Sequence, residues 1–511
     1  MALYSDQKHL TFVFVRPIFK SKKKNAQKQD AHPYTGFLLA HQPKSIVNMP
    51  LMVSISGIRG IFGNGLDAMV LVKYASAYGV WIRNRATEIG RKPLIAVGRD
   101  ARVTGELCQN IVMQTLRSVG CDVLDVGLAT TPTVEMAVLG ANAVGGIILS
   151  ASHNPAEWNA LKLLNELGEF LTPDQGSEVL SLAESGSITA VSYDKIGAYE
   201  AKDYLPYHIE KIINLPYIHP DEIAAKRFKI VVDGVNSVGG VAIPALLEAL
   251  GLGEEQIICL HCEPTGRFAH NPEPLPEHLA EIMEAVKIHG ADLGIVVDPD
   301  ADRLAFVAND GTFYGEELTQ VTAADFLLKI KAGPFATNLS SSRAADDVVA
   351  LHGQKSYRAA VGEINVVMKM KEVGAVIGGE GNGGVILPDL HYGRDALVGT
   401  AIVLQHLVNT GKTLAELKAQ YPSYCISKNK ITLENVDADA VLKAIAERYK
   451  YERISTIDGV KIDFSEGWVH LRKSNTEPII RIYAEGRTMN DATGYARRFM
   501  DELTGIAQSK S

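Results

Sequence analysis

The feature that most constrains the fold is a repeated alternation between short, almost wholly apolar runs and longer stretches with apolar residues at helical spacing. It begins near Met52 and covers most of the chain. Runs in which nearly every residue is apolar indicate strands that helices cover on both faces, since half-exposed strands alternate polar and apolar residues. The order therefore predicts α/β units with mostly parallel sheets. The apolar runs are 94–98, 145–149, 229–232, 293–297 and 375–377, and a typical helical stretch is 106–119.

The C-terminal part has a different pattern. A helical stretch at 437–449 precedes strand-like runs at 460–464, 468–471 and 479–483, and a final helix follows. In these runs polar and apolar residues alternate, which is typical of an antiparallel sheet with one exposed face. We expect an α+β domain here.

Composition excludes several classes of protein. The 511 residues are enough for three or four domains, and 59 Asp+Glu against 51 Lys+Arg give a net charge of -8, which argues against nucleic-acid binding. No apolar run approaches the ~20 residues of a membrane-spanning helix. The five scattered cysteines make no disulfide framework. We expect a cytoplasmic protein without nucleic-acid or membrane partners.

Residues 1–48 differ from the rest. They hold eight Lys or Arg against two acids and have no sustained period. A targeting peptide is conceivable, but the segment has few Ser and Arg for one. We expect a basic, disordered extension, or upstream translation from a start earlier than Met49 or Met52.

Polar or Gly-rich loops follow several of the predicted strands. In open α/β sheets ligands bind beyond the carboxyl ends of the strands, so these loops predict one site assembled from several domains. The loops are 98–102, 150–154, 298–303 and 378–384.

Asp298, Asp300 and Asp302 alternate directly after a buried strand. In extended backbone the positions i, i+2 and i+4 point to one side, so the three carboxylates can converge. A hard divalent cation such as Mg²⁺ would offset their repulsion. An EF-hand is excluded because Arg303 stands where that loop requires Gly. The alternatives are a solvated acidic turn, or a phosphatase in which one Asp takes up phosphate.

Ser152 lies after a strand, beside His153 and before an Asn-Pro turn, which makes it a candidate exposed nucleophile. An ordinary turn explains the same residues. No Gly-x-Ser-x-Gly elbow is present, which weighs against an acyl hydrolase. Together with the acidic loop, Ser152 is better interpreted as a metal-assisted carrier of a phosphoryl group.

Two further loops have binding chemistry. The loop 472–478 and Arg481 combine guanidinium, hydroxyl and amide groups, which suit a phosphate monoester; the alternative is a solvated hairpin. Arg59, in a Gly-flanked loop, is a similar candidate. The Gly-x-Gly-x-x-Gly fingerprint of dinucleotide-binding proteins is matched by Gly379, Gly381 and Gly384. Strand-like residues follow instead of the helix that such a site needs, so we reject a dinucleotide-binding site here. Glu380 and Asn382 suit sugar hydroxyls instead.

Cys259 and Cys262 form a lone C-x-x-C pair, for which we expect buried packing.

Four of these motifs occur in the order found in the α-D-phosphohexomutases, the family of phosphoglucomutase, phosphomannomutase and phosphoglucosamine mutase. The chain resembles this family from about Met52 to its C-terminus, and most closely the archaeal-type phosphoglucosamine mutases. The four motifs are Ser-Ala-Ser-His-Asn-Pro (150–155), Asp-Pro-Asp-Ala-Asp-Arg (298–303), Gly-Glu-Gly-Asn-Gly (379–383) and Arg-Lys-Ser-Asn-Thr-Glu-Pro (472–478).

The resemblance implies three α/β domains with mostly parallel sheets and a C-terminal α+β domain around a central cleft. The expected bounds are 49–200 with the phosphoserine loop, 201–308 with the metal loop, 309–424 with the sugar-binding loop and 425–511 for phosphate binding. It also implies an isomerase, an intramolecular phosphotransferase that interconverts hexose 6-phosphate and hexose 1-phosphate through phosphorylated Ser152 and a hexose 1,6-bisphosphate.

The resemblance further implies residue roles. One Mg²⁺ would be held by Ser152, through its phosphate, with Asp298, Asp300 and Asp302. Other residues would surround the transferring phosphoryl group: Arg59, His153, Lys162 and Arg303. The sugar hydroxyls would bind Glu380 and Asn382. The second phosphate would bind Arg472, Ser474, Asn475, Thr476 and Arg481.

Two departures from the family pattern bear on activity and substrate. Many relatives carry His at the position of Gly384, so its role passes to His391 or Lys162, or is absent. Asn475 is typical of enzymes acting on glucose or mannose phosphates, whereas the loop at 379–384 favours glucosamine phosphate. We favour glucosamine 6-phosphate and glucosamine 1-phosphate, with phosphoglucomutase or phosphomannomutase activity as the alternative. A Mg²⁺-dependent sugar-phosphate phosphatase is the alternative of another class.

Overall fold

The computed structural model describes residues 51–54, 57–186, 188–432, 437–473 and 479–510. The basic extension at 1–48 lies outside these ranges, and so do Ser474, Asn475 and Thr476. Within the described part of the chain, no helix is both long and apolar enough to cross a lipid bilayer.

The first sheet has the strand order β1-β2-β7-β6-β4-β5-β8, with β3 paired to β2. Its strands are β1 (Met52–Ser54), β2 (Gly57–Phe62), β3 (Gly65–Leu66), β4 (Leu94–Arg99), β5 (Asp122–Leu128), β6 (Gly145–Leu149), β7 (Trp158–Leu164) and β8 (Tyr199–Ala201). Its helices are α1 (Ala68–Ile89), α2 (Gly105–Ser118), α3 (Thr131–Gly140) and α4 (Pro173–Ser185).

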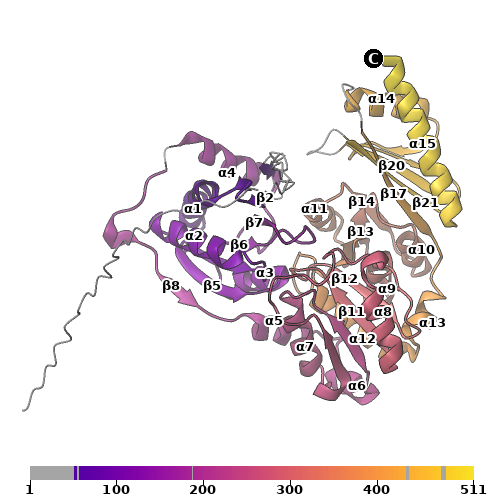
Figure 1. Ribbon diagram of the computed structural model, residues 1–511, viewed down its shortest axis with the longest axis horizontal. Coiled ribbons are helices and arrows are strands. Elements are labelled where there is room, and N and C mark those ends of the chain that lie inside the picture. Colours follow the sequence, from indigo (N-terminus) through magenta and orange to yellow (C-terminus); the bar gives the residue numbers. More distant parts are fainter. Residues whose placement is uncertain (1–50, 55–56, 187, 433–436, 474–478, 511) are drawn as a thin grey trace, which may run out of the picture. The chain divides into compact units, whose positions relative to one another are not determined.

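Helices cover both faces of this sheet (Figure 1). Alternate residues of a strand point to opposite faces. Ile147 and Leu149 of β6 therefore join the core beneath α1, α2 and α4, whereas Ile148 joins the core beneath α3. This two-sided burial explains why the strand is apolar at every position.

The second and third sheets repeat one plan. Their orders are β10-β9-β11-β12 and β14-β13-β15-β16, and in each only the last strand is antiparallel to its neighbour. The second sheet has β9 (Ile230–Asp233), β10 (Ile257–Leu260), β11 (Leu293–Val297) and β12 (Leu304–Ala308), with α5 (Leu205–Ile213), α6 (Pro220–Lys226), α7 (Gly239–Ala249) and α8 (Ala280–His289). The third has β13 (Phe335–Asn338), β14 (Ser356–Ala359), β15 (Ile377–Glu380) and β16 (Gly384–Ile386), with α9 (Glu316–Leu328), α10 (Ala344–Leu351), α11 (Glu363–Val373), α12 (Ala396–Thr410) and α13 (Leu414–Lys418).

The three loops with candidate chemistry occupy equivalent places. Each joins a strand of the parallel part of a sheet to the antiparallel strand beside it: β6 to β7, β11 to β12 and β15 to β16. The loop therefore turns sharply at the carboxyl end of a buried strand, which holds its polar side chains at a fixed place on the sheet edge.

The fourth sheet is antiparallel throughout, with the order β17-β21-β20-β19-β18. Helices α14 and α15 contribute to one core with the sheet, against which they are seen in Figure 1. The elements are β17 (Cys425–Thr432), β18 (Arg453–Ser455), β19 (Val460–Asp463), β20 (Trp468–Lys473), β21 (Ile479–Gly486), α14 (Ala438–Arg448) and α15 (Met489–Lys510).

The predicted fold class is confirmed: three α/β parts with mostly parallel sheets precede an antiparallel α+β part. The predicted strands at 145–149 and 293–297 have the observed bounds. The expected burial of both cysteines in the C-x-x-C pair is wrong, because Cys259 is exposed and Cys262 is half-buried. Cys259 lies on β10, which pairs only with β9 and so is an edge strand of its sheet.

Candidate active site

A cavity of about 390 Å³ is lined by residues that follow or belong to strands of all four sheets. The three loops between parallel and antiparallel strands contribute to it, and β20 and β21 contribute from the fourth sheet. The predicted site residues that line it are Arg59, Ser152, His153, Lys162, Arg303, Glu380, Asn382, Arg472 and Arg481. The structure thus brings together groups that are hundreds of positions apart in the sequence.

Ser152 follows β6 in a conformation that non-glycine residues seldom adopt, with φ of +50°. Its backbone N–H donates to Ser150 Oγ at 2.9 Å, and its own Oγ donates to Asp298 Oδ2 at 2.6 Å. The residue is only 4% exposed. The turn therefore holds the hydroxyl at the cavity wall, directly against the acidic loop.

A buried arginine that the sequence analysis did not select holds this turn in place. The guanidinium of Arg102 donates to the carbonyl oxygens of Ser152, Asn154 (2.8 Å) and Pro155 (2.6 Å), and its Nε pairs with Asp100 at 2.9 Å. Its place in the polar loop 98–102 was the available signal. Three carbonyls bound to one planar group fix the backbone against rotation.

The acidic loop joins β11 to β12. Asp298, Asp300 and Asp302 are fully buried, and one carboxylate oxygen of each lies within 4.8 Å of the others. Asp300 Oδ1 and Asp302 Oδ1 are buried without a hydrogen-bond partner in the described structure. Asp302 Oδ1 lies 3.9 Å from Arg303 Nε, too far for a hydrogen bond. Buried carboxylate oxygens without hydrogen bonds are costly, and a divalent cation with oxygen ligands removes that cost. The donor set therefore fits Mg²⁺.

The pKa values of Asp298 and Asp300 in this loop are shifted in opposite directions. Burial, together with the neighbouring Asp302 and Asp300, raises the pKa of Asp298 well above its ordinary value. Burial alone would also raise the pKa of Asp300, but the ammonium of Lys162 outweighs it and holds that pKa below its usual range. Lys162 therefore favours the charged form of Asp300.

Cationic side chains stand between the acidic loop and the cavity. Lys162 Nζ, on β7, donates to Asp300 Oδ2 at 2.5 Å and lies 3.4 Å from Asp302 Oδ2. Arg303 donates its backbone N–H to Asp298 Oδ1 at 3.2 Å. Arg59 on β2 donates to Asn154 Oδ1 at 2.8 Å. These groups can neutralise an anion that enters the cavity beside Ser152.

His153 is a neutral member of this group. Burial, and then the cations Arg303 and Arg59, lower the pKa of its imidazole far below the ordinary value. Its Nδ1 lies 3.4 Å from Ser152 Oγ. The shift favours the uncharged imidazole, which can donate or accept a hydrogen bond at this position.

The loop between β15 and β16 presents Glu380 and Asn382. Glu380 Oε1 accepts from Asn338 Nδ2 at 2.8 Å and from the backbone N–H of Gly362 at 3.0 Å. Gly383 has φ of +91°, and a Cβ there would lie 2.3 Å from the carbonyl oxygen of Leu304. Only glycine lets this loop pack so closely against the strand that follows the acidic loop.

Arg472 on β20 and Arg481 on β21 lie opposite each other in the antiparallel register. Arg472 Nε is fixed by Asp458 at 2.8 Å, whereas Arg481 is exposed to the cavity. His470 on β20 accepts or donates a 2.8 Å hydrogen bond with Ser340, which connects this sheet to the third. The structure thus places two guanidinium groups at the cavity, on a different sheet from the one that Ser152 follows.

Several polar residues that the sequence analysis did not select also line the cavity: Glu273, Glu317, Asn338, Glu363, Arg394 and Lys428. No motif marks them, because each lies in an ordinary helix start, strand or loop. His391, one of the alternatives for the missing family histidine, is not among the lining residues, whereas Lys162 is.

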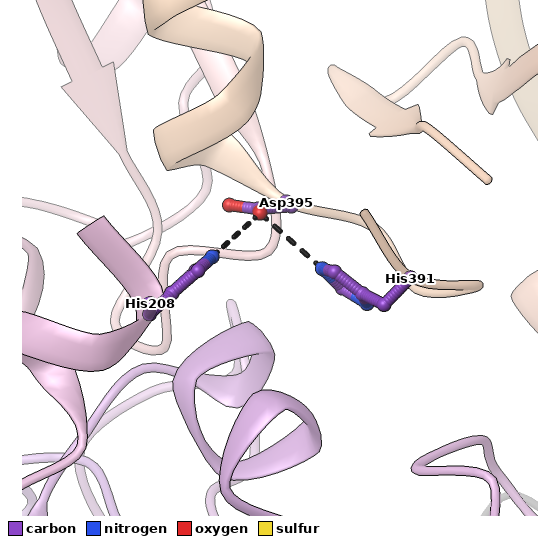
Figure 2. A group of neighbouring side chains, drawn as sticks. All are labelled: His208, His391 and Asp395. Atoms are coloured by element: carbon purple, nitrogen blue, oxygen red, sulfur yellow. Dashed lines mark hydrogen bonds and ion pairs between the residues drawn. The ribbon is translucent and has the colours of Figure 1, made fainter. Parts of the chain in front are cut away.

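His391 instead belongs to a second buried cluster, drawn in Figure 2. His208 Nε2 on α5 lies 2.9 Å, and His391 Nε2 3.2 Å, from the same oxygen of Asp395. The other Asp395 oxygen accepts from the backbone N–H groups of Leu397 and Val398 in the first turn of α12, and His208 Nδ1 bonds the hydroxyl of Thr133 of α3. The cluster therefore joins helices that pack on the first and second sheets to the loop before α12. Since these polar atoms bond one another, we interpret it as a structural junction.

We expect this junction to lose stability as pH rises. Burial alone would lower the pKa of His391, but Asp395 and Glu135 outweigh it and raise the pKa to about 10, above the value of about 6.5 in an unfolded chain. The stabilisation is fully present below about pH 6.5 and is lost as pH rises towards 10. The melting temperature should fall across this range, and fall less in His391→Gln.

The groups that face His391 are Asp395, Glu135 and His208. His289→Gln, at an exposed histidine on α8, is the matched control and should keep the wild-type pH dependence. Equal slopes of melting temperature against pH in the wild type and His391→Gln would show that His391 carries no such charge.

The comparisons with known proteins agree with this architecture. Models of the four phosphoglucomutase/phosphomannomutase domains match in order: the alpha/beta/alpha domains I, II and III at 52–188, 206–311 and 314–424, and the C-terminal domain at 428–502. A phosphoglucomutase/phosphomannomutase from Thermococcus kodakarensis is 37% identical over 443 residues, 86% of this chain and 95% of that protein.

Two further relatives are similar over nearly their whole length. A probable phosphoglucosamine mutase from Methanopyrus kandleri is 32% identical over 89% of this chain and 97% of its own. The crystal structure of a phosphoglucomutase/phosphomannomutase family protein from Burkholderia thailandensis has a TM-score of 0.77 and 26% identity. It covers 89% of this chain and 98% of that one.

The fold and the cavity define a four-part α/β protein in which a serine and an acidic loop meet among cations. The chain belongs to the phosphoglucomutase/phosphomannomutase family, the α-D-phosphohexomutases. It is a phosphohexomutase, an isomerase that moves a phosphoryl group within a hexose phosphate.

Proposed function

We propose that this enzyme interconverts glucosamine 6-phosphate and glucosamine 1-phosphate through phosphorylated Ser152 and a hexose 1,6-bisphosphate. The observation that carries the proposal is the contact between Ser152 Oγ and Asp298 Oδ2, 2.6 Å long, at a cavity whose other wall carries Arg472 and Arg481. A serine beside an acidic loop and a remote anion-binding pair are what a phosphoryl transfer between two ends of one sugar requires.

Each group has a separate task in this scheme. The sugar hydroxyl forms a bond to phosphorus while the bond from phosphorus to Ser152 Oγ breaks. Over the whole step the proton of the sugar hydroxyl passes to Ser152 Oγ, which becomes a free hydroxyl again. Lys162, Arg303 and Arg59 neutralise charge on the transferring group, and Asp298, Asp300 and Asp302 would hold Mg²⁺. When bound, Mg²⁺ would supply further charge neutralisation.

Groups on the third and fourth sheets would orient the sugar phosphate. Glu380 and Asn382 would bind sugar hydroxyls, and Arg472 and Arg481 the phosphate that does not react. Because that phosphate is far from the reacting bond, the same pair would serve either end of the bisphosphate after it reorients. We assign Ser474, Asn475 and Thr476 to this group from the motif alone, since they lie outside the described residues.

The glucosamine assignment has two supports. The relative from Methanopyrus kandleri is named a probable phosphoglucosamine mutase. The cavity is also lined by Glu273, whose partly exposed carboxyl group suits the ammonium group of glucosamine. The name of the Thermococcus kodakarensis relative favours glucose and mannose phosphates as the second candidate.

The five cysteines are free thiols, in keeping with the cytoplasmic location that we propose.

Mass spectrometry of the purified protein tests the cycle. We expect a single ~80 Da adduct, the mass of a phosphoryl group, that maps to Ser152 and is discharged by glucosamine 6-phosphate. Parallel incubations with glucose and mannose phosphates rank the substrates. Steady release of inorganic phosphate without any adduct, even after loading with a sugar bisphosphate, would favour a phosphatase instead.

Replacing Arg481 by Gln should weaken substrate binding more than turnover. The exposed guanidinium would hold the non-reacting phosphate, and a charge-assisted bond of this kind contributes about 1.5–3 kcal/mol, or roughly 10- to 100-fold in KM. Steady-state kinetics measures the change. Arg453→Gln, at an exposed arginine of β18 on the same sheet, is the control and should keep the wild-type KM. A wild-type KM in Arg481→Gln would remove Arg481 from the phosphate site.

A further inference from the structure

The side chain of Arg394 fills the space beside Gly384, where another residue would carry its own side chain. Gly384 begins β16, and Arg394 forms an isolated bridge with Ile386 of the same strand. A Cβ at Gly384 would lie 2.3 Å from Arg394 Cδ and 2.8 Å from its Cγ. Such distances are far below normal contact, so the side chain of Arg394 occupies the space that any larger residue at 384 would need.

The guanidinium in that space joins three carboxyl groups. Arg394 Nη2 donates to Asp302 Oδ2 at 2.7 Å, Nη1 to Glu380 Oε2 at 2.8 Å, and Nε lies 3.0 Å from Glu363 Oε2. Its side chain is 10% exposed and lines the cavity. One planar cation therefore contacts both the acidic loop and the loop at 379–384.

The contact to Asp302 leaves the other oxygen of that residue available. Arg394 and Lys162 occupy Oδ2, whereas Oδ1 has no hydrogen-bond partner in the described structure. A cation that fixes one carboxylate oxygen orients the other, in the way that outer partners orient metal ligands. The same guanidinium fixes Glu380, whose second oxygen is already bound by Asn338 and Gly362.

We propose that Arg394, in the space left by Gly384, is a positioning residue that sets the orientation of the metal-loop carboxylate Asp302 and of the sugar-loop carboxylate Glu380 together. The inference deepens the proposed function, on which its sugar part rests. Without the guanidinium, Asp302, Glu380 and Glu363 would be neighbouring buried carboxylates without a common partner, and their repulsion would displace both sites at once. Lysine does not replace it, since a single ammonium cannot hold three carboxylates in a fixed plane.

Calorimetric titration of Mg²⁺ into the unliganded protein tests the metal side. In Arg394→Lys we expect Mg²⁺ affinity to fall about 10- to 100-fold, the usual effect of losing an outer partner of a metal ligand. Gly384→Ala should change it in the same direction without altering any charge, because the new Cβ displaces the arginine. Steady-state kinetics should also give a higher KM for hexose phosphate in both variants.

Arg358→Gln is the matched control. Arg358 is also an arginine of the third sheet with a carboxylate partner, Asp346 at 2.6 Å, and its side chain is 15% exposed, but it does not line the cavity. The Arg358→Gln substitution should lower the melting temperature and leave the Mg²⁺ dissociation constant of the folded protein unchanged. A role of Arg394 in stability alone would give the same result as this control.

The possible results separate this inference from the proposed function. A folded Arg394→Lys protein with Mg²⁺ affinity and KM both within twofold of wild type would overturn the inference, whatever the substrate. If glucosamine 6-phosphate fails to discharge Ser152 but Mg²⁺ affinity still depends on Arg394, the metal side of the inference holds and the substrate assignment fails.

Discussion

Ser152→Ala is expected to lower mutase turnover by at least about 10⁴-fold, because the variant has no atom that can carry the phosphoryl group between the two ends of the sugar. The fold should persist. The lost hydroxyl makes one hydrogen bond to Asp298, and such a bond contributes only about 0.5–3 kcal/mol, the upper end applying to a charged acceptor. A coupled assay of hexose phosphate isomerisation, together with a melting curve, measures both effects.

Ser177→Ala is a suitable control, since Ser177 is exposed on α4 of the same α/β part. It should have wild-type turnover. The ~80 Da adduct should be absent from Ser152→Ala and present in the control. A Ser152→Ala protein that keeps a tenth of the turnover would disprove the phosphoserine assignment.

Asp300→Asn should reduce turnover and Mg²⁺ affinity together, by about 10²- to 10³-fold and at least about 10-fold respectively. Asp300 Oδ2 is already occupied by Lys162 (2.5 Å) and Thr131 (2.6 Å), so the unpartnered Oδ1 is the atom available to a cation. An amide keeps the shape of the side chain but removes the charge that balances both Lys162 and the metal. Initial rates over a Mg²⁺ titration, with direct calorimetric binding, measure the two effects.

Asp310→Asn provides the comparison for this variant. Asp310 is an exposed aspartate in the turn after β12, where its carboxylate accepts hydrogen bonds from the backbone N–H and the hydroxyl of Thr312. Its Mg²⁺ response should equal that of the wild type. If Asp300→Asn also responds to Mg²⁺ like the wild type, Asp300 does not belong to the metal site.

Much of the architecture was predictable because it depends on local patterns. The run 145–149 is apolar at every position, and the structure confirms it as β6 with helices on both faces. Asp298, Asp300 and Asp302 were expected to converge from their spacing alone, and their oxygens lie within 4.8 Å of one another. The order of motifs also sufficed to identify the family.

Other parts of the site were not predictable from local patterns. Arg102 acts on backbone carbonyls about 50 positions away, and the sequence contains no sign of which carbonyls these are. His391 was an alternative for the missing family histidine, but it is bound to Asp395 in a separate cluster. Nothing in its sequence neighbours distinguishes a cavity residue from a junction residue.

The sequence by itself determined the strands, the helices, the loops that end the buried strands and the chemistry that those loops carry. These follow from the period of apolar residues and from alternation along an extended chain, which act over a few positions. Only the tertiary structure decided which charges pair. Arg394 meets Asp302 across 92 positions because Gly384 leaves room for its side chain and the antiparallel register sets that glycine opposite Glu380. Such a pairing depends on packing between distant elements, since Coulomb attraction in a buried site is strong only at the short distances that packing imposes.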